Sequence, residues 1–367
     1  MDTAFSYNFP ALRGKQAEKE YFVVMCPLRL IPKIFLFDEE ELPPKHRAQR
    51  ILNKNRIPEM TNYIIDNQKD YVFSSLTASI DGEIEFQPFS KEQSWNDLGR
   101  LLVSLDAKFL INDGQHRRAA IEEALKISPE LGGETISVVF FQDEGLKNSQ
   151  QIFSDLNRHA VNTTSSIGIL YDHRDCLALL TKEVVSENEL LARYTDMERV
   201  SLSKNSPKLM ALNHIFNTNL KLLGKSKGDV VNTDDEKFVK SFWNTLCDTI
   251  VEWKMVLNKE LAPKELRMNY IVGHGVFLEA VGMIGKAAYE QEPSQWEKYI
   301  DNLANIDWDR SNTKDWEGRA FSTNGRIQKN NLTIQLTANL IKQKLGLPLT
   351  EADKKAENKL KVGDNND

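Results

Sequence analysis

One short run carries the residues best suited to chemistry: Asp113, Gly114, Gln115, His116 and Arg117, followed by Arg118. A β-rich run precedes it and a helical pattern follows it, so the run is expected at a junction between a strand and a helix. Gly114 permits a tight turn there, or the close approach of a ligand to the backbone. The two arginines then fall in the first turn of the helix.

This placement of cations predicts a phosphate site. A helix N-terminus carries a partial positive charge, so arginines in its first turn gain from a bound anion. Free backbone amides, the helix dipole and the forked side chains of Arg117 and Arg118 together suit a phosphate. Asp113 is expected to hold Mg²⁺ or a ribose hydroxyl. The alternative is that Asp113 only caps the helix and that the arginines are solvated.

The elements that position the run follow from hydrophobic periodicity. β-rich runs alternate with helical patterns in the first half of the chain, which predicts an α/β fold with mixed strand connections. The predicted strands are Tyr21–Met25, Ile34–Phe37, Tyr71–Ile80, Phe109–Asn112 and Thr135–Phe141. The predicted helices are a stretch from Pro43 through Leu52, Pro58–Asn67, a helix that runs from the motif to Lys126, and Lys147–Asn157.

The second half is predicted to be almost entirely helical. Ser206-Pro207 and Gly224 mark the start and end of one helix, because proline favours the first turn and glycine the C-terminus. Thr233 starts another, whose apolar stripe extends to Trp253 and indicates core packing. Further helices are expected at Val272–Glu290, Ser294–Asn305 and Asn331–Leu345. The polar segment after Leu349 is expected to be disordered.

Composition limits the classes of function. The 367 residues include 47 basic and 53 acidic side chains, so the net charge of −6 excludes a globally basic coat for nucleic acid. Cys26, Cys176 and Cys247 lie far apart and form no metal-binding or disulfide pattern, as is usual in a reducing cytosol. No zinc or iron–sulfur metal site is therefore predicted. Apolar stretches are far shorter than the ~20 residues of a membrane span, so no membrane partner is expected.

The central run, with the alanines that follow it, resembles the DGQHR-domain proteins of the wider ParB/sulfiredoxin-like superfamily. In that superfamily a strand–turn–helix of this form grips nucleotide phosphates. The resemblance implies a nucleoside triphosphate with Mg²⁺ as cofactor and leaves an ATPase open as an alternative function. It implies catalytic roles for Asp113 and His116. The implied nucleotide-binding residues are Gly114, Gln115, Arg117, Arg118, Asn157 and Arg158. Asn157 and Arg158 come from a looser match to a second motif of the superfamily, and the alternative is that these two residues only cap the end of a helix.

Further segments are similar to the DndB family of DNA sulfur modification proteins. They include Asn55–Glu59, Tyr71–Thr77, Phe153–Arg158, Asp172–Asp175 and Trp316–Ala320. The family implies an accessory protein of the bacterial system that replaces a non-bridging phosphate oxygen of DNA with sulfur. It also implies a repressor that binds DNA at the promoter of the modification genes. Other sulfur-modification proteins are implied as partners, and a homo-oligomer is left open.

A DNA-binding role requires local positive charge. Three windows poor in acidic residues supply it: 45–56, 199–228 and 310–329. A charge run is more often a solvated face, but three such windows stand out in an acidic chain. The candidate DNA-binding residues are Lys45, Arg47, Arg50, Lys54, Arg56, Lys225, Lys227 and Arg326.

These observations predict an α/β N-terminal ParB/sulfiredoxin-like domain with a small mixed sheet at residues 1–172. A mainly α-helical C-terminal domain at 173–349 and a disordered tail at 350–367 follow it. A cytoplasmic, nucleoid-associated location is expected. Asp172-His173-Arg174-Asp175 is interpreted as a helix start with acidic caps rather than a metal cluster. His274, between two glycines, has no partner that the sequence identifies.

Overall fold

The computed structural model describes residues 6–35, 54–92, 95–143, 151–152, 155–156 and 163–363, and the side chains of these residues as far as 360. The chain divides into two compact units, Met1–Val161 and Asn162–Asp367. The predicted boundary at residue 172 is later than the observed one. Helix α5 (Ser165–Tyr171) belongs to the second unit, because Ile169 packs into its hydrophobic core.

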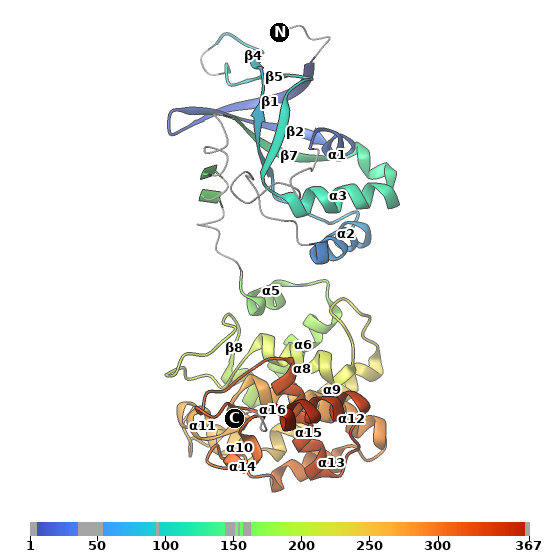
Figure 1. The fold of residues 1–367 in the computed structure, drawn as a ribbon, viewed down its shortest axis with the longest axis vertical. Helices are drawn as coiled ribbons and strands as arrows, with labels where there is room; N and C mark the ends of the chain where they lie inside the picture. The colour runs from blue at the N-terminus through green and yellow to red at the C-terminus, as the bar shows by residue number, and fades with distance from the viewer. Residues whose placement is uncertain are drawn as a thin grey trace. The chain divides into compact units, whose positions relative to one another are not determined.

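The first unit is built on a mixed sheet of seven strands (Figure 1). Their order across the sheet is β4-β5-β1-β2-β7-β3-β6, and β3 and β7 form the parallel pair among antiparallel ones. The bounds are β1 (Ser6–Gln16), β2 (Lys19–Pro27), β3 (Leu76–Asp81), β4 (Ile84–Pro88), β5 (Leu98–Ser104), β6 (Lys108–Asp113) and β7 (Thr135–Gln142).

Three helices cover one side of this sheet: α1 (Ile31–Ile34), α2 (Ile57–Asp66) and α3 (Gln115–Ile127) (Figure 1). The small side chains of Ala120 and Ala124 let α3 approach the sheet closely, and both are buried in one core with Leu76 and Phe140. The helix therefore begins directly at the end of β6, with its first turn at the edge of the core.

Several predictions for this unit are wrong. Ile34 ends a short helix rather than starting a strand, because Pro32 opens a turn in which Ile31 and Ile34 are buried together. The strand predicted at Tyr71–Ile80 begins only at Leu76. Strands β1, β4 and β5 have no counterpart among the predicted strands. The helix predicted from Pro43 to Leu52 and most of the one at Lys147–Asn157 lie outside the described residues.

The second unit is mainly helical and has its own core. A two-stranded parallel ladder, β8 (Thr195–Asp196) and β9 (Met210–Ala211), accompanies the helices. The helices after α5 are α6 (Cys176–Glu187), α7 (Glu189–Tyr194), α8 (Leu212–Leu223), α9 (Thr233–Thr249), α10 (Val251–Leu257), α11 (Pro263–Asn269), α12 (Gly275–Gln291), α13 (Glu297–Asp301), α14 (Thr313–Trp316), α15 (Asn331–Leu345) and α16 (Glu351–Gly363).

The helix predictions hold best where a cap is encoded locally. Asn232 caps α9, Asn330 caps α15, and Asp175 accepts from the Ala178 amide at the start of α6. By contrast, α8 starts at Leu212 and not at Ser206-Pro207. The stripe predicted to reach Trp253 on one helix is divided at Ile250 between α9 and α10.

The disordered tail predicted after residue 349 is wrong for Glu351–Gly363, which form α16. Two ion pairs attach this helix to the unit: Asp353 with Lys342 at 2.8 Å and Glu357 with Arg319 at 2.7 Å. Asp353 and Lys342 are only 1% and 5% exposed. Charged residues of α16 therefore form buried ion pairs with the rest of the unit and are not simply exposed to solvent.

Candidate functional site

The turn between β6 and α3 requires a glycine. Gly114 has φ of +105°, and a Cβ there would lie 2.4 Å from Leu76 Cδ2. Gly114 is itself the N-cap, so Asp113 does not cap the helix, which corrects the sequence interpretation. The first turn of α3 has neither a side-chain cap nor an acidic residue. Its N-terminal amides and dipole therefore suit an anion.

Arg117 is held by the protein itself. Its Nη2 pairs with Asp113 Oδ2 at 2.7 Å, and its Nη1 donates to the carbonyl oxygens of Ser74 at 2.8 Å and Ser75 at 2.9 Å. A further short bond links Nη1 to Ser74 Oγ. The side chain is 13% exposed. Arg117 thus ties the first turn of α3 to the segment before β3, and this geometry favours a positioning role over direct phosphate contact.

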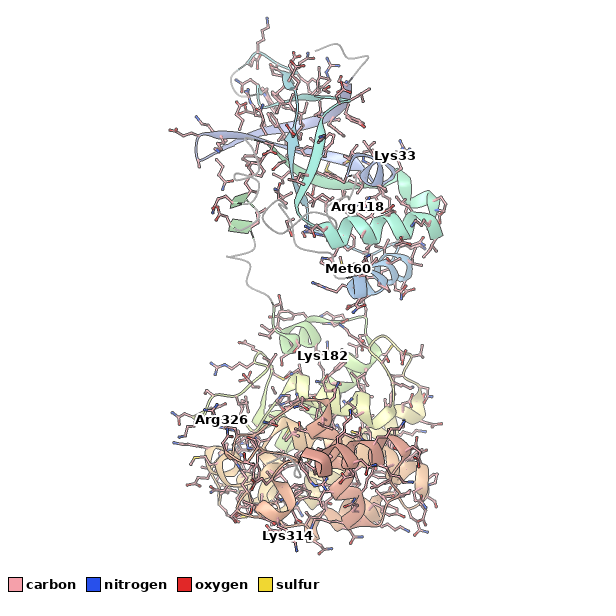
Figure 2. The ribbon with its side chains drawn as sticks, viewed as in Figure 1. Lys33, Met60, Arg118, Lys182, Lys314 and Arg326 are labelled. Carbon is pink, nitrogen blue, oxygen red and sulfur yellow. The ribbon has the colours of Figure 1, made fainter. Side chains whose placement is uncertain are left out.

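Arg118 has unused hydrogen-bonding capacity. The residue is 9% exposed, and its Nη1 pairs with Glu122 Oε2 at 2.6 Å (Figure 2 labels it on α3). Its buried Nε has no hydrogen-bond partner among the described residues. A buried donor without an acceptor costs about 1–3 kcal/mol, which a phosphate oxygen would recover. Of the two predicted arginines, Arg118 is the better candidate for an anion contact.

His116 is neutral at pH 7. Burial lowers its pKa, and the positive charge of Arg56 lowers it further. A neutral imidazole can accept or donate a proton, as the predicted catalytic role requires. Arg56, predicted from its charge window to touch DNA, thus lies within electrostatic range of the central run. Gln115, beside His116, is buried at 7% exposure.

The residues at the turn differ in how well they fit the two parts of the implied magnesium nucleotide. The start of α3 and Arg118 suit phosphate, while the Asp113 carboxylate is already paired with Arg117. No cluster of three or more potential metal-binding side chains occurs among the residues that the structure describes. Asn157 and Arg158 of the second box, together with Lys45, Arg47 and Arg50, lie outside the described residues. Lys54 is described and exposed.

In the helical unit, parts of two of the predicted basic segments, 199–228 and 310–329, are held at the same end of α11. Arg267, at the end of α11, donates from Nη2 to Ser206 O at 2.6 Å and also to the carbonyls of Ser203 and Lys204, and from Nη1 to Lys208 O. These bonds fix the loop at residues 199–208. Sequence reasoning missed this role and had no signal for it, because the partners lie about 60 residues away.

Arg310 holds the second loop to the same end of α11. Its Nη1 donates to Met268 O at 3.1 Å and its Nη2 to Gly325 O at 2.6 Å. The loop at 199–208 and the turn at 322–326 therefore form one surface, which we call the basic platform. Arg199, Lys204 and Arg326 are exposed on it and form no ion pair with any described residue (Figure 2 labels Arg326).

Two half-buried histidines, His214 and His274, lie close to the residues that hold this platform. His274 Nε2 bonds Arg267 O at 2.8 Å, which supplies the partner that the sequence did not reveal. His214 of α8 lies against Gly275. The pKa of both histidines falls to about 4, mainly because of burial and also because of nearby cations, Lys329 beside His214 and Arg310 beside His274. Both imidazoles are neutral at pH 7.

The other predicted DNA contacts of this unit lie elsewhere. Lys225 follows the far end of α8, donates to Val230 O at 2.8 Å and pairs with Asp235. Lys227 is exposed in the same loop. A helix of this length spans roughly 18 Å, so the two lysines are separated from the platform at the start of α8. The structure thus groups Arg326 with Arg199 and Lys204 rather than with Lys225 and Lys227.

The cysteines show no features of an activated thiol. Cys26 and Cys247 are buried, and Cys176 is exposed and not disulfide-bonded. Burial raises the pKa of Cys26 to about 12, so its thiolate is negligible at neutral pH. No helix in the described part of the chain is long and apolar enough to cross a membrane.

The fold and the site define a class of protein: a mixed α/β unit with a glycine turn and an arginine-bearing helix start, followed by a helical unit with a clamped basic surface. The sequence model of one protein family, described as DndB: DNA-sulfur modification-associated, matches residues 9–348. Because the match covers nearly the whole chain, the chain belongs to the DndB family. Neither the curated proteins nor the solved structures yielded a match.

Replacing Arg117 by alanine should destabilise the first unit. The change removes a shielded guanidinium and leaves Asp113 without its ion pair, so we expect a decrease of about 2–3 kcal/mol in the free energy of unfolding. Arg117→Lys should recover little, because an ammonium cannot reach the carboxylate and both carbonyls together. Urea unfolding followed by far-UV circular dichroism measures this, with Lys126→Ala at the other end of α3 as control. If Arg117→Ala is as stable as the wild-type protein, the contacts of Arg117 with Asp113, Ser74 and Ser75 do not stabilise the unit.

Proposed function

We propose that this chain is a DNA-binding repressor and accessory protein of DNA sulfur modification, and that the basic platform contacts the DNA backbone. Membership of the DndB family gives the biological system. The observation that carries the DNA-binding role is the pair of clamps, Arg267 and Arg310, which hold two basic loops on one end of α11. Exposed arginine and lysine side chains on a fixed scaffold suit contacts with successive phosphates.

The platform explains how an acidic chain binds a polyanion. Arg199, Lys204 and Arg326 lack carboxylate partners among the described residues, so their charge is available to DNA although the chain totals −6. Phosphate contacts set affinity and register, whereas base contacts set sequence preference. The platform therefore accounts for affinity and its salt dependence, and the promoter preference rests on the family relationship.

Charge reversal tests this role. The double variant Lys204→Glu, Arg326→Glu should bind a promoter fragment at least tenfold more weakly than the wild-type protein. The slope of the logarithm of its binding constant against the logarithm of the salt concentration should be smaller in magnitude by ~0.9 for each phosphate that the variant no longer neutralises. The matched control is Lys237→Glu on α9, an exposed lysine whose ion pair with Asp234 is 3.6 Å long. Fluorescence anisotropy across salt concentrations, with random DNA for comparison, gives both quantities.

Two results would overturn the proposal. If the wild-type protein shows no preference for the promoter over random DNA at any salt concentration, the repressor role fails. If the double variant and the Lys237→Glu control bind equally well, DNA does not use the platform.

We propose as a second candidate that the turn at Gly114 binds a nucleoside triphosphate, which regulates DNA affinity or is hydrolysed. The unpartnered Nε of Arg118 at an uncapped helix start favours this role. His116, neutral at pH 7, is the proton acceptor in such a site. The kinship with ParB and sulfiredoxin, expected from the sequence, belongs to this proposal.

Arg118→Met tests the nucleotide role, because it keeps most of the buried volume and removes the donors. We expect ATP binding in the presence of Mg²⁺ to weaken at least tenfold, with any hydrolysis reduced in parallel. Isothermal titration and phosphate release measure the two effects. Absence of binding and turnover in the wild-type protein would rule the nucleotide role out.

A further inference from the structure

The helical unit contains an open cleft of about 830 Å³ that neither proposed role uses. Its walls come from α8 and the loop after it, from α12, and from α15 with the segment after it and the first turn of α16. The volume falls within the range of ~300–1,000 Å³ that is usual for small-molecule sites. The cleft is therefore large enough for a ligand of nucleotide size.

The charges of the cleft indicate an anionic ligand. Its carboxylates are already neutralised by lysines: Glu279 by Lys329 at 2.8 Å, Glu290 by Lys286 at 3.6 Å and Asp353 by Lys342 at 2.8 Å. Lys225 is paired with Asp235. The remaining lysines of the wall, Lys221 and Lys227, are exposed and have no described carboxylate at ion-pair distance, although Lys227 lies within electrostatic range of Asp172. Lys221 therefore supplies uncompensated positive charge at one end of the cleft, and Lys227, whose charge Asp172 compensates only in part, lies beside it.

Stabilisation of the end of α8 does not by itself account for these lysines. A helix C-terminus favours cations, and Lys221 lies in the last turn. However, Gly224 already ends the helix in the left-handed conformation, with φ of +63°. The Lys225 amide bonds Leu220 O at 3.1 Å, and Lys286 packs directly against Gly224. The carbonyls of Leu220 and Lys221 near the helix end therefore have backbone partners without the side chain of Lys221 or Lys227.

The remaining wall is apolar and neutral polar. Leu220, Met283 and Ala287 form an apolar surface, and Asn217 and Gln335 offer amide groups beside it. Leucine and methionine side chains suit the face of a planar ring, and methionine sulfur adds a favourable contact with aromatic systems. The cleft thus combines a surface for a ring with a cationic end for phosphate.

We propose that this cleft binds a nucleoside phosphate, with the phosphate at Lys221 and Lys227 and the base against Leu220 and Met283. The site is separate from the turn at Gly114, which lies in the other unit. A nucleoside phosphate bound here contacts α8, α12 and the segment before α16, so it also stabilises the attachment of that helix by binding only the folded unit.

The test uses the full chain and trinitrophenyl-ATP as a fluorescent probe. We expect Lys221→Glu, Lys227→Glu to weaken probe binding at least tenfold, and Ala287→Trp to do the same by filling the cleft without changing its charge. Lys237→Glu, which makes the same charge change on α9 outside the cleft, should bind as the wild-type protein does. Arg118→Met should leave probe binding to the cleft unchanged, which distinguishes the cleft from the proposed site at Gly114.

Competition identifies the chemistry of the ligand. Unlabelled ATP should displace the probe at lower concentration than inorganic pyrophosphate, because pyrophosphate lacks the ring. The proposal is overturned if the wild-type protein does not bind the probe, if both cleft variants bind it normally, or if Arg118→Met alone abolishes binding. Equal competition by pyrophosphate and ATP would contradict the assigned ring surface.

Discussion

Replacing Lys342 by methionine is expected to destabilise the helical unit by about 3–5 kcal/mol, because it leaves the carboxylate of Asp353 buried without a counter-charge. The two side chains are almost fully buried, and Asp353 also accepts from the Thr350 amide at 2.8 Å. For a unit of this size the change corresponds to a melting-temperature decrease of roughly 6–20 °C. Differential scanning calorimetry measures it.

Matched variants isolate the buried pair. Lys354→Met removes an ion pair with Glu351 of the same 2.8 Å length, but its side chains are 58% and 82% exposed, so we expect less than about 0.5 kcal/mol. Adding Asp353→Leu to Lys342→Met should recover much of the missing stability, because no uncompensated charge remains. Equal effects of Lys342→Met and Lys354→Met would show that α16 does not depend on the buried pair.

The same pair predicts a pH dependence. Burial alone would raise the pKa of Asp353, but the bonds from Lys342 and from the Thr350 amide lower it below its usual value. A carboxyl with a lowered folded-state pKa contributes stability above its unfolded pKa near ~4 and loses it as the pH falls through the folded value. Lys342→Met should remove this acid-side decrease, since the isolated carboxyl then protonates more easily.

The attachment of α16 has a consequence for the cleft. Thr350, Ala352 and Asp353 contribute to its wall, so the ion pair that holds α16 also shapes the proposed nucleotide site. A polar C-terminal segment that would be disordered alone becomes part of a binding surface. Polarity alone predicts a disordered tail, because local sequence does not reveal that Lys342 and Arg319 supply its partners.

Two other incorrect predictions have one shared physical cause. The pattern at Tyr71–Ile80 predicts a strand throughout, but the carbonyls of Ser74 and Ser75 accept hydrogen bonds from Arg117 instead of from a neighbouring strand. The helix expected from Ser206 starts later, because Arg267 binds the carbonyls of Ser206 and Lys208 that a helix would use. In each case a distant arginine competes with the regular backbone pattern.

Local signals, by contrast, predict much of the site. The junction of β6 with α3, the glycine turn at Gly114 and the cationic helix start all follow from residues adjacent in sequence, whereas the absence of a cap from Asp113 does not. The sequence does not distinguish the roles of Arg117 and Arg118. Those roles depend on Ser74 and Ser75, about 40 residues away, and on the burial of the Arg118 guanidinium.

Acidification is expected to weaken the helical unit through His214 and His274. Their pKa is about 4 in the folded protein, against ~6.5 in the unfolded chain, so the unfolded state binds protons first. Stability is therefore fully present above pH ~6.5 and falls as the pH drops from there toward 4. At pH 5 each histidine accounts for a decrease of up to about 2 kcal/mol, and the two together for up to about 4 kcal/mol.

Urea unfolding between pH 7.5 and 5 measures this decrease, and His274→Gln should roughly halve its slope, because one of two titrating groups is removed. The amide of glutamine still allows a bond to Arg267 O, so the variant should retain its stability at pH 7.5. His173→Gln, at an exposed position before α6, is the control and should leave the slope unchanged. Since His274 and Arg310 both hold the Arg267 end of α11, promoter binding should weaken over the same pH range. A stability that is constant from pH 7.5 to 5 would mean that these imidazoles are not held neutral close to the platform.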